Sequence, residues 1–179
     1  MVPMPVSPYA ATKVACECYL RAYAAVYGME TLSLRYVNVF GPYQDPEGAY
    51  AAVIPAFVSS VLSGNPPTVF GDGEQSRDFC YIDNVCEANW LAAHAPAEVC
   101  DGSVCNISCN QATSLNEILE LLRELMNVDI QAEYTDPRPG DVKDSLADVS
   151  RAGELVGYEP KVYFAEGLRK AIDWYTQNL

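Results

Sequence analysis

Short runs of apolar, β-branched residues alternate along this chain with longer stretches of helical character. TLSLRYVNVF at 31–40 has the composition of a buried strand closed by Gly41-Pro42, and VCNIS at 104–108 predicts a second strand. Helical stretches lie before, between and around them, at 8–27, 49–64 and 84–95. Strands that alternate with helices are typical of α/β proteins. We therefore expect an α/β fold, in a chain whose 179 residues are enough to bury a core.

Capping residues mark several helix boundaries. Ser7 is a suitable N-cap and Pro8 a suitable first residue for a helix that should end at Gly28. Ser114 and Glu117 form a capping box ahead of an amphipathic helix over 114–126. The remaining predicted elements are short strands at 66–70 and 77–82 around a Gly-Asp-Gly turn, a strand at 131–136, a loop at 136–145, and helices at 150–157 and 164–179.

The formal net charge of −13 argues against nucleic acid or an anionic membrane as a partner, because both attract basic surfaces. The sequence has no apolar run long enough to span a bilayer, and MVPMPVS lacks the basic and apolar regions of a secretion signal. We therefore expect a cytoplasmic protein. An acidic total still allows an anionic small molecule, because a few arginines in a pocket can bind one locally.

The seven cysteines do not have the spacing of a zinc framework. Cys16 and Cys18 share a predicted helix, the other thiols are irregularly spaced, and His94 is the only histidine in the sequence. We therefore expect free thiols, most of them buried, and no metal site.

The heptapeptide SPYAATK at 7–13 places Tyr9 four residues before Lys13, so both side chains lie on one face of the predicted helix. An ammonium group beside a phenol favours the phenolate, and such a tyrosine can act as a general base or acid on an alcohol. The same spacing also occurs on surface helices, where the tyrosine packs and the lysine is solvated. The pair by itself leaves both interpretations open.

Five motifs follow one another along the chain: SPYAATK, LRYVNVFGP, GAYAAVIPAF, VFGDGEQSRDFCYIDNV and DPRPGDVKDSLAD. With them the chain resembles the extended short-chain dehydrogenase/reductase family over essentially its whole length, and within it the UDP-sugar 4-epimerases that act on UDP-N-acetylglucosamine. The resemblance implies an NAD-dependent isomerase that interconverts the C4 epimers of a UDP-hexose. It also implies a partial Rossmann-type fold, with the last units of a parallel sheet and a smaller α/β substrate-binding region.

The resemblance further implies roles for individual residues. Tyr9 would be the catalytic base, Lys13 would bind the nicotinamide ribose of NAD, and Val37 would line the nicotinamide. The residues implied at the UDP-sugar are Asn38, Ala52, Val53, Thr68 to Phe70, Arg77, Arg138 and Asp141. Their chemistry agrees, because arginines suit a diphosphate and an aspartate suits a ribose diol. Taken singly, Arg77 could equally form an ion pair with the neighbouring Asp78 at a strand edge, and Asn38 could cap a turn.

Ser145, in DVKDSLAD, occupies the position at which many members of this family carry a bulky tyrosine that restricts them to UDP-glucose and UDP-galactose. A small side chain leaves room for an N-acetyl group at C2, because the shape of a pocket decides which substrates enter. The residue favours interconversion of UDP-N-acetylglucosamine and UDP-N-acetylgalactosamine.

The sequence has no G-x-G-x-x-G or G-x-x-G-x-x-G turn to hold the pyrophosphate of a dinucleotide, and only eight residues precede Tyr9. We therefore expect the C-terminal half of such an enzyme. Residues 1–40 would be a remnant of the NAD-binding domain, and 41–179 would be mainly the substrate-binding region, with some segments returning to the NAD-binding sheet. Such a chain should bind NAD weakly and show no turnover alone.

Two further expectations concern partners and alternatives. The apolar faces of 8–27 and 31–40 should remain open, which favours a homodimer or a domain-swapped oligomer. The alternative functions are a nucleotide-sugar 4,6-dehydratase, decarboxylase or reductase of the same family, and a non-catalytic module that binds nucleotide-sugars.

Overall fold

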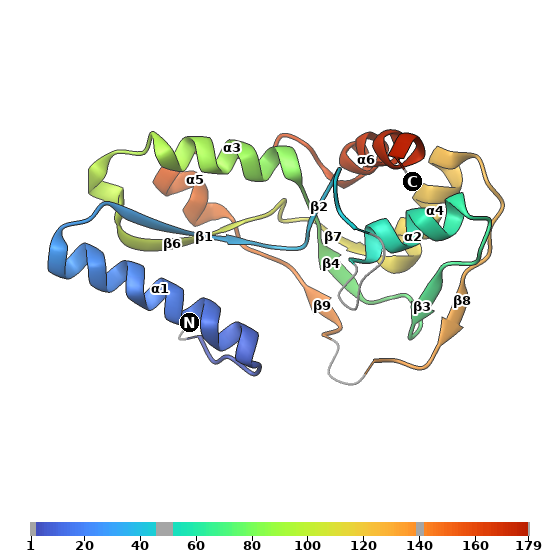
Figure 1. Cartoon of the computed structure of the whole chain (residues 1–179), viewed down its shortest axis with the longest axis horizontal. Helices are drawn as coiled ribbons and strands as arrows, with labels where there is room; N and C mark the ends of the chain where they lie inside the picture. Colours follow the sequence, from blue (N-terminus) through green and yellow to red (C-terminus); the bar gives the residue numbers. More distant parts are fainter. Residues whose placement is uncertain (1–2, 46–51, 139–141, 179) are drawn as a thin grey trace.

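The computed structural model describes residues 3–45, 52–138 and 142–178. Helices flank short strands, and four of the five strand pairings in these residues are parallel (Figure 1). The predicted α/β class is confirmed.

The elements follow one another in the order that Figure 1 colours from blue to red. The helices are α1 (Pro8–Tyr27), α2 (Val53–Leu62), α3 (Ile82–Ala93), α4 (Leu115–Met126), α5 (Ser150–Val156) and α6 (Phe164–Asn178), with a 3-10 turn at Ala97–Val99. The strands are β1 (Thr31–Tyr36), β2 (Val39–Phe40), β3 (Thr68–Phe70), β4 (Ser76–Asp78), β5 (Cys80–Tyr81), β6 (Asp101–Ile107), β7 (Ala112–Ser114), β8 (Glu133–Thr135) and β9 (Asp144–Ser145).

The predicted helix caps are present. The hydroxyl of Ser7 accepts a hydrogen bond from the backbone N–H of Ala10 at 3.1 Å, and Gly28 ends α1 in the left-handed conformation at a φ of 65°. Ser114 and Glu117 form the predicted capping box at the start of α4. These boundaries therefore agree with local sequence chemistry.

The prediction of one strand over 31–40 is wrong at residues 37 and 38, where the strand is interrupted. β1 ends at Tyr36, and the chain turns at Asn38, whose φ is +40°, before β2 begins at Val39. β1 pairs with β6, whereas β2 pairs with β5. β1 and β2 therefore have different partner strands, and the chain turns between them at an asparagine, a residue type that tolerates a positive φ.

Other differences arise from strand pairing. The predicted loop at 136–145 contains β9, which pairs with β4, and β4 also pairs with β7, a strand that the sequence did not indicate. The two short strands around the Gly-Asp-Gly turn lie in different sheets, since β3 pairs with β8, whereas β4 pairs with β7 and β9. The predicted strand at 77–82 is divided into β4 and β5, and Ile82 already belongs to α3.

Two apolar clusters form the core. The larger joins α2, α4 and α6 around Phe40, Phe79 and Phe164, with the rings of Phe79 and Phe164 centred 5.2 Å apart. The smaller includes Ile107 of β6 and packs against α3 and α5. β5 joins the two clusters, because Tyr81 packs in the larger and Cys80 in the smaller.

α1 lies on one side of the β1–β6 pair, and α3 and α5 lie on the other (Figure 1). None of the 20 residues of α1 is buried, and its exposed apolar side chains include Tyr19, Tyr23, Val26 and Tyr27. An ion pair of 2.6 Å between Glu17 and Arg35 joins the helix to β1. None of the helices in the described part of the chain is long and apolar enough to cross a membrane.

All seven cysteines are free, as predicted, but the prediction that most are buried is wrong. Cys16 and Cys18 are exposed and lie on α1, none of whose residues is fully buried, and only three thiols are buried: Cys80, Cys105 and Cys109. Within the described residues no group of His, Cys, Asp or Glu could hold a metal ion.

Candidate functional site

A cavity of about 370 Å³ lies between α2, β3 and the turn that leads into β4. This volume is in the range of sites for small molecules. The cavity is lined by Val53, Ala56, Phe57, Ser60, Thr68, Phe70, Gln75, Leu115 and two arginines, Arg77 and Arg138.

One wall of the cavity is a face of α2. Val53, Ala56, Phe57 and Ser60 are spaced three, four and seven residues along the helix, so their side chains lie on one side of it. Phe57 is buried in the larger core cluster, which anchors this wall. The wall is apolar except for the hydroxyl of Ser60.

The opposite wall combines an aromatic ring with a cation. The guanidinium carbon of Arg138 lies 3.9 Å from the centroid of the Phe70 ring, within cation–π distance. Phe70 is half-buried at the end of β3, and its backbone C=O accepts a hydrogen bond of 2.5 Å from the side chain of Gln75. The backbone of Phe70 is therefore held by Gln75, and the face of its ring is in contact with Arg138.

Arg77, in the middle of β4, supplies the second guanidinium. Its Nη1 donates hydrogen bonds to the backbone C=O of Ser76 at 2.8 Å and of Lys143 at 3.0 Å. The β4–β9 pairing places Arg77 opposite Ser145, and the hydroxyl of Ser76 donates to Asp144 at 2.8 Å. The direction of this arginine thus depends on the segment 143–145.

Asn116, near the start of α4, lies next in sequence to Leu115 of the cavity and binds the turn that precedes Gln75. Its side-chain amide donates to the C=O of Asp72 at 3.1 Å and to the carboxylate of Glu74 at 2.6 Å. The hydroxyl of Tyr134 donates to its amide oxygen at 2.8 Å. The turn between β3 and β4 is therefore tied to α4 and β8.

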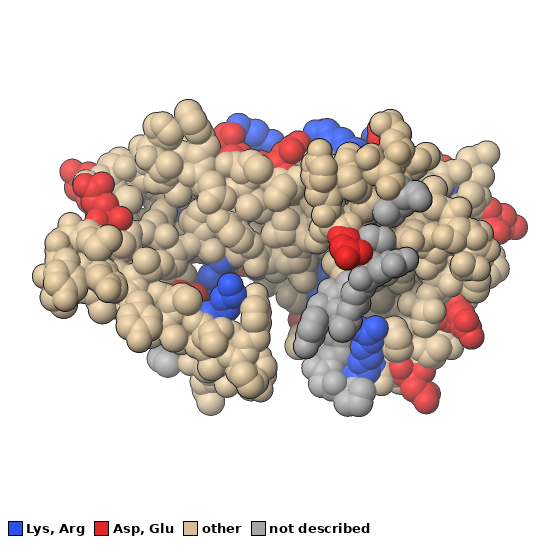
Figure 2. Space-filling model, in the orientation of Figure 1, with Lys and Arg blue, Asp and Glu red and all other residues tan. Residues whose placement is uncertain are grey.

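Two guanidinium groups at one cavity are notable in a chain with a net charge of −13. Basic side chains also lie beside the notch between the α1 side and the β3–β8 side of the molecule (Figure 2). Guanidinium groups donate paired hydrogen bonds to phosphate oxygens, and an aromatic face can stack on a base. Among the described residues that line the cavity none is acidic and none is a His or Cys, so the charged groups of this lining are both cationic.

Tyr9 and Lys13 lie elsewhere, at the amino end of α1. They share one face of the helix as predicted, with the Lys13 ammonium 5.4 Å from the centroid of the Tyr9 ring. Tyr9 is 72% exposed, and neither residue lines the cavity. The amino end of α1 is the end nearer to β9 in Figure 1.

The structure brings together five of the residues named from the sequence: Val53, Thr68, Phe70, Arg77 and Arg138. Ala52 is the N-cap of α2, next to the cavity. Val37 and Asn38 at the β1–β2 break and Ser145 on β9 do not line it, and Asp141 lies outside the described residues.

Further lining residues were not predicted from the sequence, namely Ala56, Phe57, Ser60, Gln75 and Leu115. The helical period counted onward from Val53 would have indicated the first three. Gln75 and Leu115 reach the cavity through a turn and a helix start that meet only in the folded chain.

Residues 2–108 match the sequence pattern of the NAD dependent epimerase/dehydratase family. Among curated proteins, a putative UDP-glucose 4-epimerase of Methanocaldococcus jannaschii is 36% identical over 174 residues, which are 97% of this chain and 55% of the relative. The chain spans about half the length of the curated relatives it matches.

Two solved structures are similar over nearly the whole chain. A UDP-N-acetylglucosamine 4-epimerase from Methanobrevibacter ruminantium M1, in complex with UDP-N-acetylmuramic acid, has 41% identity and a TM-score of 0.92, covering 98% of this chain and 56% of that chain. A UDP-glucose 4-epimerase from Thermotoga maritima, with UDP-glucose, has 40% identity and a TM-score of 0.91, covering 98% and 55%.

Proposed function

The chain belongs to the NAD-dependent epimerase/dehydratase family, and we propose that its cavity binds the uridine diphosphate part of a UDP-hexose. One observation carries the proposal: an aromatic ring and two guanidinium groups share a cavity of about 370 Å³. Phe70 would flank the uracil, and Arg77 and Arg138 would donate to the diphosphate oxygens.

For the complete reaction we propose epimerisation at C4 of the hexose, which the similarity to 4-epimerases supports. NAD, when bound, supplies the acceptor and donor of the hydride at C4. The phenolate oxygen of Tyr9 would take the proton from the 4-hydroxyl group, and Lys13 would hold the nicotinamide ribose. These roles require the two side chains to share one face of α1, and the Lys13 ammonium lies 5.4 Å from the centroid of the Tyr9 ring.

The residues present fit only part of NAD. Tyr9, Lys13 and Val37 suit the ribose and nicotinamide, but the sequence has no Gly-rich turn for the pyrophosphate. With this function, residues 1–40 would belong to the NAD-binding part and 41–179 mainly to the substrate-binding part. We expect the purified 179-residue chain to bind UDP and to show little NAD binding and no turnover.

Isothermal titration calorimetry of the purified chain tests the proposed site. UDP should bind, and Arg138→Ala should weaken it by about tenfold to a hundredfold, because a hydrogen bond to a charged group contributes about 1.5–3 kcal/mol. Arg169→Ala is a matched control, since it removes the same charge from an exposed position on α6 away from the cavity. UDP that does not bind, or that binds both variants equally, would refute the proposal.

We further propose an N-acetylated hexose as the sugar, because Ser145 is small and lies opposite Arg77. UDP-N-acetylglucosamine should bind the chain at least as tightly as UDP-glucose. Ser145→Tyr should weaken UDP-N-acetylglucosamine and leave UDP unchanged. An equal effect on both ligands would contradict the assignment of the sugar without affecting that of UDP.

Self-association through α1 is proposed as well. The helix has no buried residue and presents Tyr19, Tyr23 and Tyr27 to solvent, an apolar surface of the kind that marks interfaces. Light scattering should show a dimer or larger oligomer, and Tyr23→Glu should shift it towards monomer. A monomer at all concentrations would exclude this interface.

A further inference from the structure

Asp78, the last residue of β4, is completely excluded from solvent. It is the only charged side chain that is buried in the described part of the chain. A buried carboxylate is unfavourable unless hydrogen bonds compensate for lost hydration, so its partners indicate what it does.

Those partners come from three segments that are distant in sequence. One carboxylate oxygen accepts from the backbone N–H of Cys109 at 3.1 Å, and the other accepts from the backbone N–H of Ala147 at 3.2 Å. The backbone C=O of Asp78 accepts from the side-chain amide of Asn38 at 3.1 Å and from the hydroxyl of Ser108 at 3.4 Å. Asp78 therefore joins the β1–β2 break, the end of β6 and the segment after β9.

The bond to Ala147 bears directly on Arg77. β9 is only two residues long, and so short a strand is weakly held by its own pairing with β4. The amino end of β9 is fixed by hydrogen bonds that the backbone N–H of Ser76 and the side chain of Arg77 donate to the C=O of Lys143. The carboxyl end of β9 is fixed by the hydrogen bond from the N–H of Ala147, two residues after Ser145, to the carboxylate of Asp78.

We propose that Asp78 is a positioning residue of the cavity, which holds the segment 143–147 in register so that Arg77 points at the diphosphate. This inference rests on the proposed function, since it assigns Arg77 to the UDP. The carboxylate acts through Arg77 and does not itself line the cavity. The backbone C=O of Asp78 also accepts the hydrogen bond from Asn38, so the same residue holds the β1–β2 break.

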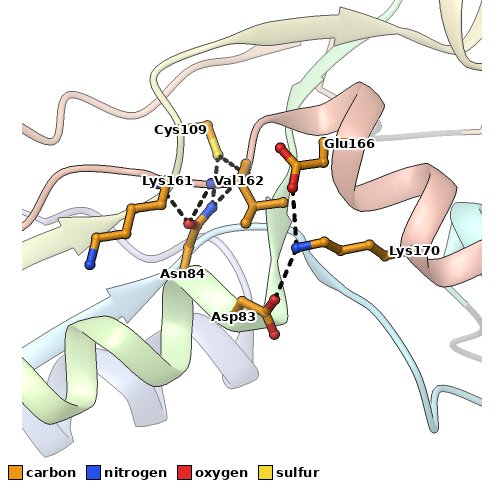
Figure 3. Close-up of polar contacts among 7 residues, drawn as sticks. All are labelled: Asp83, Asn84, Cys109, Lys161, Val162, Glu166 and Lys170. Atoms are coloured by element: carbon orange, nitrogen blue, oxygen red, sulfur yellow. Dashed lines mark hydrogen bonds and ion pairs between the residues drawn. The ribbon is translucent and has the colours of Figure 1, made fainter.

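Asn84 provides a matched control for burial. It is 2% exposed and likewise joins distant segments, donating to the C=O of Val162 at 2.7 Å and accepting from the N–H groups of Lys161 and Val162 (Figure 3). It also donates to the sulfur of Cys109 at 3.5 Å. The partners of Asn84 are Cys109, Lys161 and Val162, and none of them belongs to the segment 143–147, so its loss should affect folding without affecting the direction of Arg77.

The test is the UDP affinity of Asp78→Asn in the full 179-residue chain, measured by calorimetry where circular dichroism shows the variant to be folded. The new NH₂ group faces a backbone N–H, so one of the two carboxylate bonds is lost. We expect the dissociation constant for UDP to rise about tenfold, a change that corresponds to one lost charged hydrogen bond. Asn84→Asp should lower the urea midpoint and leave the dissociation constant within about twofold of wild type.

A double-mutant cycle separates positioning from general loss of structure. In an Arg77→Ala background, Asp78→Asn should change the dissociation constant by less than about twofold, because its effect runs through that arginine. The positioning role is overturned if the two substitutions change the dissociation constant for UDP by independent factors, or if Asp78→Asn binds UDP like wild type. Neither result contradicts the proposed UDP site. Wild-type protein that does not bind UDP overturns both.

Should Asp78→Asn not fold, Ala147→Pro keeps the carboxylate and removes the N–H that one of its oxygens accepts. The same rise in the dissociation constant and the same dependence on Arg77 are expected. A UDP affinity equal to that of wild type refutes the positioning role in this variant too.

Discussion

Replacing Gly73 with alanine tests how the turn between β3 and β4 is held. Gly73 has a φ of +78°, and an added Cβ would overlap the amide oxygen of Asn116 and lie 2.7 Å from its Cγ. The Asn116 side chain would have to move, and with it the three hydrogen bonds to Asp72, Glu74 and Tyr134.

The expected loss has two parts. A residue with a Cβ in the left-handed region costs about 1–2 kcal/mol. Three exposed hydrogen bonds, each at about 0.5 kcal/mol, the low end of the usual range, add about 1.5 kcal/mol. The free energy of unfolding should therefore fall by about 3 kcal/mol for Gly73→Ala.

Gly64→Ala is the matched control. Gly64 has a similar φ of +71°, but no described heavy atom lies within 4 Å of the Cβ position, so only the backbone part applies. Urea unfolding followed by tryptophan fluorescence should show that Gly73→Ala costs about 1.5 kcal/mol more. Equal losses in the two variants would refute the assigned role of Asn116, and an Asn116→Ala background should abolish the excess.

Three further predictions concern charge, burial and thiols. The hydrogen bond from Arg35 holds the pKa of Glu17 below its usual value, so the pair stabilises the fold above pH 4.5 and this contribution is lost as the pH falls through the lowered pKa. The loss in urea midpoint for Glu17→Gln should accordingly shrink on acidification from pH 7, and a constant difference would contradict the pairing. Tyr158→Phe removes a buried hydrogen bond of 2.9 Å to the C=O of Ser108 and should cost about 1–2 kcal/mol in urea unfolding, so an unchanged midpoint would count against it. A thiol reagent should quickly label the exposed cysteines of the native protein, which are Cys16, Cys18 and Cys86. The buried cysteines, Cys80, Cys105 and Cys109, should react only after unfolding. A single labelling rate for all of these thiols would argue against the observed burial.

The candidate site was only partly visible in the sequence. The ordered motifs named Val53, Thr68, Phe70, Arg77 and Arg138, which line one cavity, although their roles at a UDP-sugar stay predictions. Asp78 stood beside Arg77 in the same motif and was considered only as a possible ion-pair partner of that arginine. Its partners lie 31, 40 and 69 residues away, so no local pattern could indicate its function.

Local chemistry determined what the sequence alone could predict. Ser7 and Pro8 mark the start of α1, Gly28 marks its end, and the Ser114–Glu117 capping box marks the start of α4. These signals are local, because a capping residue bonds backbone groups within one helical turn. The alternation of strands and helices likewise determined the α/β class.

Tertiary structure alone decided the break at Asn38, the existence of β7 and β9, and the cavity. Strands of two or three residues have too few hydrogen bonds to form by propensity, so they exist only where distant segments meet them. The buried carboxylate of Asp78 shows the same dependence, because two distant backbone N–H groups compensate for its lost hydration only in the folded chain.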